Sequence, residues 1–236
     1  MAGFAGFDIS GFPKQPVMDW RRANTDLVWC GFYPGPAPGH GDTSWMGGWG
    51  TAPVFVGQPL SGAHSSHIVT GPQGTTDGGD AAKRMAQAGF PPGSCVFLDL
   101  EDGPPLNAPR TDYAAAWVTA VKAGRYRPGI YGSHAIAANV QALHGNVPIP
   151  AFKVPTTDQT DFSSMQFPDP PPAGCGYPAA AAWQLQQWQL QQWRLQQWRL
   201  QQTCQFDLPG ASVTNPVVDL DSAMTPGPGA PPATSV

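Results

Sequence analysis

Two carboxylates at the end of one apolar segment are the residues of this chain best suited to chemistry. Asp99 and Glu101 close the segment Cys95-Val-Phe-Leu-Asp-Leu-Glu101 at spacing i, i+2. On a strand, side chains two apart share a face and lie about 6.5–7 Å apart along it. That separation falls within the range of about 5–9.5 Å between the two carboxyl groups of glycosidases. The pair therefore indicates acid catalysis on a glycoside, although a solvated strand end can carry the same pattern.

Other reactive patterns are weaker. His64 and His67 have the i, i+3 spacing of metal ligands, but they lie in a Gly/Ser-rich stretch without a clear third ligand, which favours a surface loop. The four cysteines show no C-x-x-C spacing, and no G-x-S-x-G turn is present. We therefore predict no metal and no cofactor.

Alternating apolar segments and helical patterns must position the carboxylates. We predict strands over 4–9, 27–33, 53–57, 96–101, 127–131, 149–154, 179–183 and 217–220, and helices over 17–23, 76–88, 112–123 and 133–143. This alternation favours a parallel sheet, either doubly wound or closed as a barrel. The turn after the first strand lacks a Gly-rich phosphate motif. We therefore predict an α/β fold, a single (β/α)8 TIM-like barrel that is irregular in its second half.

In such a barrel, the polar residues at the strand ends meet at one mouth. These residues are Asp8, Tyr33, Gln58, Asp99, Glu101, Tyr131 and Asp219. Their convergence from separate strands supports a site more strongly than the Asp-x-Glu pair alone.

Composition excludes several other functions. Charged residues make up 12% of the 236 residues, about half the usual ~25%, and the net charge is −4. No basic stripe is present, so we predict no nucleic-acid partner, and no apolar run reaches about 18 residues, so we predict no membrane span. The first residues lack the pattern of a signal peptide. We predict one domain over 1–224 and a disordered Pro/Gly-rich tail over 225–236.

A pentapeptide repeat, WQLQQ-WQLQQ-WRLQQ-WRLQQ, occupies 183–202. Neither a helix nor a strand would give it one buried face, because a helix advances each Trp by about 140° and a strand alternates the units. It is either an aromatic platform for a ligand or a tolerated insertion, and exposed Trp and Leu would promote self-association. Cys175 and Cys204 flank the repeat and are the pair that we expect to be bonded in an oxidising compartment.

An ordered set of segments resembles one bacterial family. The segments are Gly6-Phe-Asp-Ile-Ser10, Trp29-Cys-Gly-Phe-Tyr33, Asp42-Thr-Ser-Trp45, Pro53-Val-Phe-Val-Gly-Gln58, Val96-Phe-Leu-Asp-Leu-Glu101, Arg127-Pro-Gly-Ile-Tyr131 and Val218-Asp-Leu-Asp221. This set is similar to the glycoside-hydrolase-like domain known as domain of unknown function 1906, which is related to the family-25 lysozymes (muramidases). The resemblance covers about residues 4–224 and implies a β/α barrel and an extracytoplasmic location.

The resemblance also implies roles for individual residues. Glu101 would be the general acid, and Asp99 would orient an acetamido group or stabilise positive charge. Asp8 and Asp219 would hold position and raise the pKa of the acid. The sugar cleft would be lined by Tyr33, Gln58, Tyr131 and Trp183. Of the repeat copies, the one that begins at Trp183 is expected to belong to the barrel.

Three functions remain open from the sequence. The chain could hydrolyse β-linked amino sugars of bacterial cell-wall glycan. It could instead bind glycan without cleaving it, or act as an assembly module through the Trp repeat. The Glu101→Gln variant separates the first two, because only an enzyme would lose turnover and keep binding.

Overall fold

A computed structural model describes residues 3–9, 12, 14–24, 27–34, 47–56, 69–100, 106–144, 151–153, 179–188 and 218–232. Within these ranges, side chains are not described at 20, 24, 134, 151–153, 185–188 and 218–220. The strands are β1 (Phe4–Asp8), β2 (Trp29–Phe32), β3 (Gly50–Phe55), β4 (Cys95–Leu100), β5 (Arg127–Gly132), β6 (Ala151–Lys153), β7 (Ala180–Trp188) and β8 (Val218–Ala223). The helices are α1 (Gln15–Asn24), α2 (Gly71–Gln87), α3 (Ala108–Ala123) and α4 (His134–Leu143). Each predicted strand and helix overlaps an observed one.

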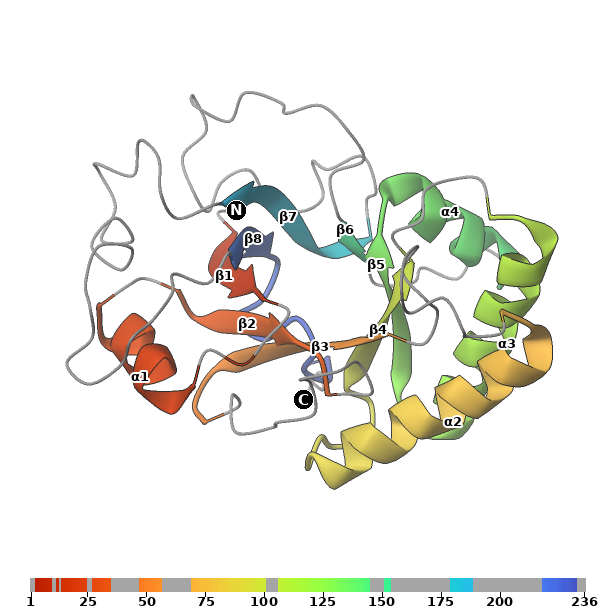
Figure 1. Cartoon of the computed structure of the whole chain (residues 1–236), viewed down its shortest axis with the longest axis horizontal. Helices are drawn as coiled ribbons and strands as arrows, with labels where there is room; N and C mark the ends of the chain where they lie inside the picture. Colours follow the sequence, from red (N-terminus) through yellow and green to blue (C-terminus); the bar gives the residue numbers. More distant parts are fainter. Residues whose placement is uncertain are drawn as a thin grey trace.

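The sheet is mixed. Strands β1 to β7 pair in chain order and run parallel, whereas β8 is antiparallel to both β7 and β1. The pairing of β8 with β1 brings the first and last strands together. In Figure 1, the strands follow one another around a curled sheet. Among the described residues, a helix follows only β1, β3, β4 and β5. The predicted (β/α)8 TIM-like barrel is therefore wrong, because that fold needs eight parallel strands, each followed by a helix.

The direction of β8 explains the failed prediction and has a consequence for the site. An apolar run reads the same for a strand that returns antiparallel as for one that arrives by a crossover, so the pattern contains no direction. Because β8 is reversed, its first residues, and not its last, lie at the carboxyl ends of the parallel strands. In the register, Asp219 pairs with Asp8, the last residue of β1.

Helices cover one part of the sheet. In Figure 1, α2, α3 and α4 lie together beside β4 and β5, and α1 lies apart, near β2. Side-chain caps start three helices: Thr70, Asn107 and Ser133 accept from the N–H of Gln73, Arg110 and Ile136 at 3.3, 3.1 and 3.3 Å. The prediction of Ser133 as an N-cap is confirmed.

Helices α2 and α3 approach closely through glycine. A Cβ on Gly74 would lie 2.2 Å from the carbonyl oxygen of Tyr113, so only glycine permits this contact. In the same interface, Tyr113 donates to Asp77 at 2.5 Å, and Gln73 donates to the other Asp77 oxygen at 2.7 Å. Burial, and secondly Asp77, raise the pKa of Tyr113 above its usual value. The buried phenol therefore stays protonated and links the two helices.

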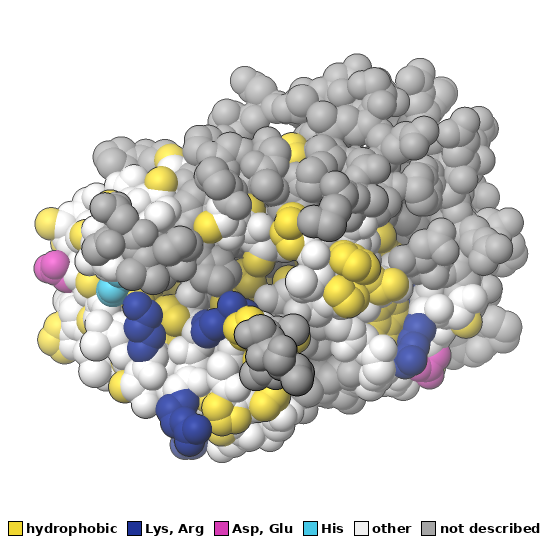
Figure 2. Space-filling model, turned by 180° about the vertical axis from the view of Figure 1, so that it is seen from behind, with side chains coloured by type: hydrophobic (Ala, Val, Ile, Leu, Met, Phe, Trp, Pro, Cys, Tyr) yellow, Lys and Arg dark blue, Asp and Glu magenta, His cyan; other side chains and the backbone are white. Residues whose placement is uncertain are grey.

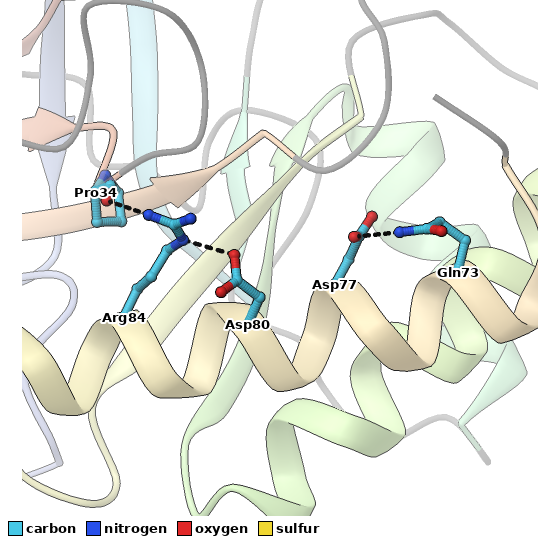
Figure 3. A network of polar contacts seen from close by, with 5 residues as sticks. All are labelled: Pro34, Gln73, Asp77, Asp80 and Arg84. Atoms are coloured by element: carbon cyan, nitrogen blue, oxygen red, sulfur yellow. Dashed lines mark hydrogen bonds and ion pairs between the residues drawn. The ribbon is translucent and has the colours of Figure 1, made fainter. Parts of the chain in front are cut away.

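Figure 3 shows that α2 also contacts Pro34, which lies just after β2. Arg84 donates to Asp80 one turn earlier at 2.6 Å and to the carbonyl oxygen of Pro34 at 3.5 Å. Pro34 follows Tyr33 at the carboxyl end of β2. Helix α2 thus helps to hold Pro34 just after the carboxyl end of β2.

Two neighbouring glycines of α2 should respond oppositely to alanine. A Cβ on Gly78 would lie 2.6 Å from the carbonyl oxygen of Trp117 and 2.7 Å from the Ala120 Cβ, whereas Gly79 has nothing within 4 Å. We expect Gly78→Ala to lower the free energy of unfolding by about 1–2 kcal/mol through overpacking. We expect Gly79→Ala to raise it by about 0.5–1 kcal/mol through helix propensity. Urea denaturation measures both, and changes of the same sign would contradict this packing.

The end of the chain packs against the sheet. Gly229 donates to the Thr51 carbonyl oxygen at 2.7 Å, and the Cys95 N–H donates to the Gly229 carbonyl oxygen at 2.8 Å. Arg127 donates to the carbonyl oxygen of Ala230 at 3.0 Å. The prediction of a disordered tail is therefore wrong for residues 225–232, because backbone groups of β3 and β4 bind this segment; residues 233–236 lie outside the described part.

Charged side chains are sparse on the face in Figure 2. The described Lys and Arg side chains lie toward the lower part of this view, and Asp or Glu side chains appear at two sides. Hydrophobic side chains lie between them. On this face, the described side chains are thus mostly uncharged, in line with the charged content of 12%.

Candidate active site

A cluster of apolar residues, the inner cluster, lies on the inner face of the sheet. The buried residues of this cluster are Trp29, Ala52, Val54, Cys95, Phe97, Tyr131, Ala182 and Ala223. Glycine makes room for the large rings, because a Cβ on Gly6 would lie 2.1 Å from the Trp29 ring and one on Gly129 would lie 2.5 Å from the Phe97 ring. Side chains alternate along a strand, so residues two positions from these members share the inner face.

Asp8 and Tyr131 meet across this inner face. Asp8 is two residues after Gly6, and it is only 4% exposed. The Tyr131 hydroxyl, from β5, donates to Oδ2 of Asp8 at 3.3 Å. Because these strands are four apart in the pairing order, the contact crosses the interior. It brings together two residues that the sequence placed in the site.

Asp99 lies beside this contact in the register. It follows Phe97 by two residues, its Cα pairs with that of Tyr131, and it is 1% exposed. Burying a carboxyl group costs free energy unless polar groups surround it. Asp8, Asp99 and the phenol of Tyr131 thus lie on the inner face at the carboxyl ends of their strands. Acid-base chemistry can use such a group of side chains.

Sequence reasoning missed two residues of this interior. Asp221 pairs with Gly6 on one side and with Gln184 on the other, and the exposed fractions of Asp221 and Gln184 are 0% and 4%. The signal was present, since Asp219 and Asp221 have the same i, i+2 spacing as the Asp99–Glu101 pair. Asp221 was missed because the predicted strand ended at Leu220, whereas β8 continues to Ala223.

The remaining predicted residues divide into three groups. Tyr33 is half-buried and packs against the inner cluster. Glu101 and Gln58 lie outside the described residues, and only the backbone of Asp219 is described. Trp183 pairs with Ser222, which in turn pairs with Ala5. Ala5 belongs to a second buried cluster, which includes Met18 of α1, so Trp183 lies on the face opposite to the acids.

The first copy of the repeat forms part of β7, as predicted for the copy that begins at Trp183. The later copies, and the predicted Cys175–Cys204 bond, lie outside the described residues. Self-association through the repeat stays a prediction. In the described part of the chain, no cluster of His, Cys, Asp and Glu has the arrangement of a metal site. No described helix is long and apolar enough to cross a membrane.

The two described cysteines are buried thiols that do not ionise near neutral pH. Burial raises the pKa of Cys30 and of Cys95 from 9.0 to about 12, and Arg21 and Arg127 oppose this rise only in part. A thiolate is the nucleophilic form of cysteine. Neither residue is therefore suited to nucleophilic catalysis.

These thiols predict a loss of stability in alkali. The unfolded thiols ionise near pH 9 and the folded ones near pH 12, so the unfolded chain binds fewer protons between these values. The free energy of unfolding should then fall as pH rises from about 9 to about 12. Thiolate absorbance in a Cys175→Ser/Cys204→Ser background measures the pH at which Cys30 and Cys95 ionise, which is the basis of this expectation. A folded protein that titrates near pH 9 would contradict the burial of Cys30 and Cys95.

A model of the Rv2525c-like glycoside hydrolase-like domain matches residues 36–221. The chain belongs to this family. The match confirms the predicted glycoside-hydrolase-like domain, whereas the relation to family-25 lysozymes stays a prediction. No curated protein sequence matches the chain.

Solved structures share the fold of this family member at low identity. A 1.07 Å crystal structure of an uncharacterized B. stearothermophilus protein has a TM-score of 0.60 and 16% identity, over 94% of this chain and 96% of that one. The Mycobacterium tuberculosis Tat-secreted protein Rv2525c has a TM-score of 0.57 in complex with HEPES, with 14% identity over 96% and 98%. In complex with L-tartrate, its TM-score is 0.58, with 14% identity over 96% and 97%. At these identities, the likeness shows the fold alone.

Proposed function

We propose that this protein hydrolyses β-linked amino-sugar glycan of the bacterial cell wall. The observation that carries the proposal is the contact between Tyr131 and Asp8 across the sheet interior, beside the buried Asp99. Membership of a glycoside-hydrolase-like family supports it. The related Rv2525c is described as Tat-secreted, which supports an extracytoplasmic location, where such a glycan occurs.

The proposed roles are those that the family resemblance implies for these residues. Glu101 comes two residues after Asp99, so a strand continued by one residue would place both on the inner face. Glu101 would donate a proton to the leaving glycosidic oxygen. Asp99 would orient the acetamido group or stabilise the positive charge that develops on the sugar ring. The Tyr131 hydroxyl holds the Asp8 carboxyl in position, and Tyr131 pairs with Asp99 in the register.

A second candidate is a glycan-binding protein that does not cleave. The deep burial of Asp8 and Asp99 favours it, since buried acids can serve hydrogen bonding alone. The related Rv2525c structures contain HEPES and L-tartrate, and tartrate has neighbouring hydroxyl groups, as a sugar does. The two candidates differ in turnover and agree in binding.

The experiment measures reducing ends released from peptidoglycan and from chitin-like oligomers, together with calorimetric binding of the oligomers. Glu101→Gln should lower turnover by about 100–10,000-fold, the range for loss of a general acid, and change affinity only a few-fold. The control is Asp112→Asn, an exposed carboxylate of α3, which should change neither quantity. Binding without turnover by the wild type would favour the second candidate, and absence of both would reject both candidates.

A further inference from the structure

The first copy of the repeat lies between two neighbouring strands. It occupies Trp183–Gln187 within β7, which pairs with β6 and with β8. The four copies are nearly identical, two reading WQLQQ and two reading WRLQQ. A shift of five residues would therefore offer much the same side chains to the same neighbours. Some feature of the fold must decide which copy enters the sheet.

The second position of the copy is a buried interior position. Gln184 occupies it, with Asp221 directly opposite on β8, and the two residues are 4% and 0% exposed. The Gln184 Oε1 has no hydrogen-bond partner among the described residues. On its other side, Asp221 pairs with Gly6, where the Trp29 ring fills the space that a Cβ would take. Asp221 thus has a buried side chain on each side, Gln184 on one and the Trp29 ring on the other.

The third and fourth copies have arginine at this position, as Arg194 and Arg199. A guanidinium group is longer than an amide and keeps its charge in proteins. Burying it costs a desolvation free energy that attraction to the carboxylate of Asp221 offsets only where the geometry is excellent. A copy with arginine is thus a poor substitute for the first copy.

Alanines before the repeat distinguish the first copy from the second. Ala180 and Ala182 are buried, and Ala182 faces Ala223 in the inner cluster with 0% exposure. A shift by five residues would put Leu185 and Gln187 in their places. Both are too large for sites filled by alanine, and the second would also bury an amide.

We infer that strand β7 accepts only a copy of the repeat with glutamine opposite Asp221, and that Ala180 and Ala182 make the first copy the one that enters. The register of the strand is thus set by three residues with small or neutral side chains. The inference does not depend on the proposed function, because it concerns which chain segment completes the sheet.

Two deletions of equal length test it. Deleting 183–192 leaves two WRLQQ copies after Ala182, whereas deleting 193–202 leaves two WQLQQ copies. The products have the same length and differ only in Gln or Arg at two positions. The 193–202 deletion should melt within about 2 °C of the wild type, since shortening the connection between β7 and β8 changes its closure entropy little. The 183–192 deletion should melt at least about 5 °C lower, or fail to fold.

Point variants of the full chain give a graded measurement. Gln184→Arg should lower the melting temperature by about 5 °C, whereas the same change in the second copy, Gln189→Arg, should leave it unchanged. Ala182→Gln places in the native register the residue that a five-residue shift would bring, and it should also lower the melting temperature. Equal melting of the two deletions, equal effects of the two arginine variants, or a silent Ala182→Gln would overturn the inference.

Discussion

Gly229→Ala should lower the free energy of unfolding by about 2–3 kcal/mol, whereas Gly227→Ala should change it by less than about 0.5 kcal/mol. A Cβ on Gly229 would lie 2.6 Å from the carbonyl oxygen of Thr51 and 2.7 Å from Cδ of Pro53. Neither the backbone nor the proline ring can move aside cheaply. A Cβ on Gly227 would have its nearest neighbour at 3.6 Å, an ordinary contact. Each variant adds one methyl group, at positions two residues apart in one segment.

The physical basis is the role of Gly229 between two strands. Strands β3 and β4 pair only at Val54–Phe97 and Phe55–Leu98. Nearer the start of these strands, Gly229 donates to Thr51 of β3 and accepts from the N–H of Cys95 of β4. The segment after β8 thus supplies hydrogen bonds that the β3–β4 ladder lacks there.

Removal of 225–236 tests the same role with a different readout. We expect the truncated protein to unfold at lower urea and its Cys95 thiol to react faster with a thiol reagent, because the Gly229 contact is lost. Cys30 is the internal control, since it lies in the cluster that packs against α1. Peptide mapping by mass spectrometry identifies the labelled cysteine. Equal labelling of Cys95 in the full and truncated chains would show that the segment does not protect β4.

Gly6→Ala should have the other large effect, a loss of about 3 kcal/mol or failure to fold. Three atoms of the Trp29 ring lie 2.1 to 2.4 Å from the position of the new Cβ. The ring is fixed by a hydrogen bond from its Nε1 to the carbonyl oxygen of Phe4 at 2.9 Å. Overpacking in a well-filled interior typically costs about 1–3 kcal/mol, and this contact is at the severe end.

A double variant shows whether Trp29 is the cause. Trp29→Phe removes part of the ring that meets the new methyl group, so Gly6→Ala should cost at least 1 kcal/mol less in that background. Thermal and urea unfolding measure the four proteins of the cycle. Equal costs of Gly6→Ala in both backgrounds would contradict the packing described. Because Gly6 precedes Asp8 by two residues, the same cycle tests the layer beneath the candidate site.

Local structure followed from the sequence. Apolar runs gave strands at the predicted places, since burial in a sheet requires such runs whatever the fold. Ser133 caps α4 because its hydroxyl satisfies an N–H within three residues, which is a local event. Asp8, Asp99 and Tyr131 converge because the carboxyl ends of parallel strands lie at one edge of a sheet. These inferences needed only short-range rules and strand direction within β1 to β7.

Tertiary structure alone decided the rest. The reversal of β8 could not be read from an apolar run, and it makes the sheet mixed and brings the start of β8, at Asp219, next to Asp8. The face of Trp183 depends on which parity of β7 points inward, and both parities of that strand include buried residues. The order of residues 225–232 depends on backbone partners far away in the sequence, which composition does not encode. The Asp99–Glu101 spacing thus determined the chemistry to look for, while long-range pairing determined which residues share the interior with Asp99.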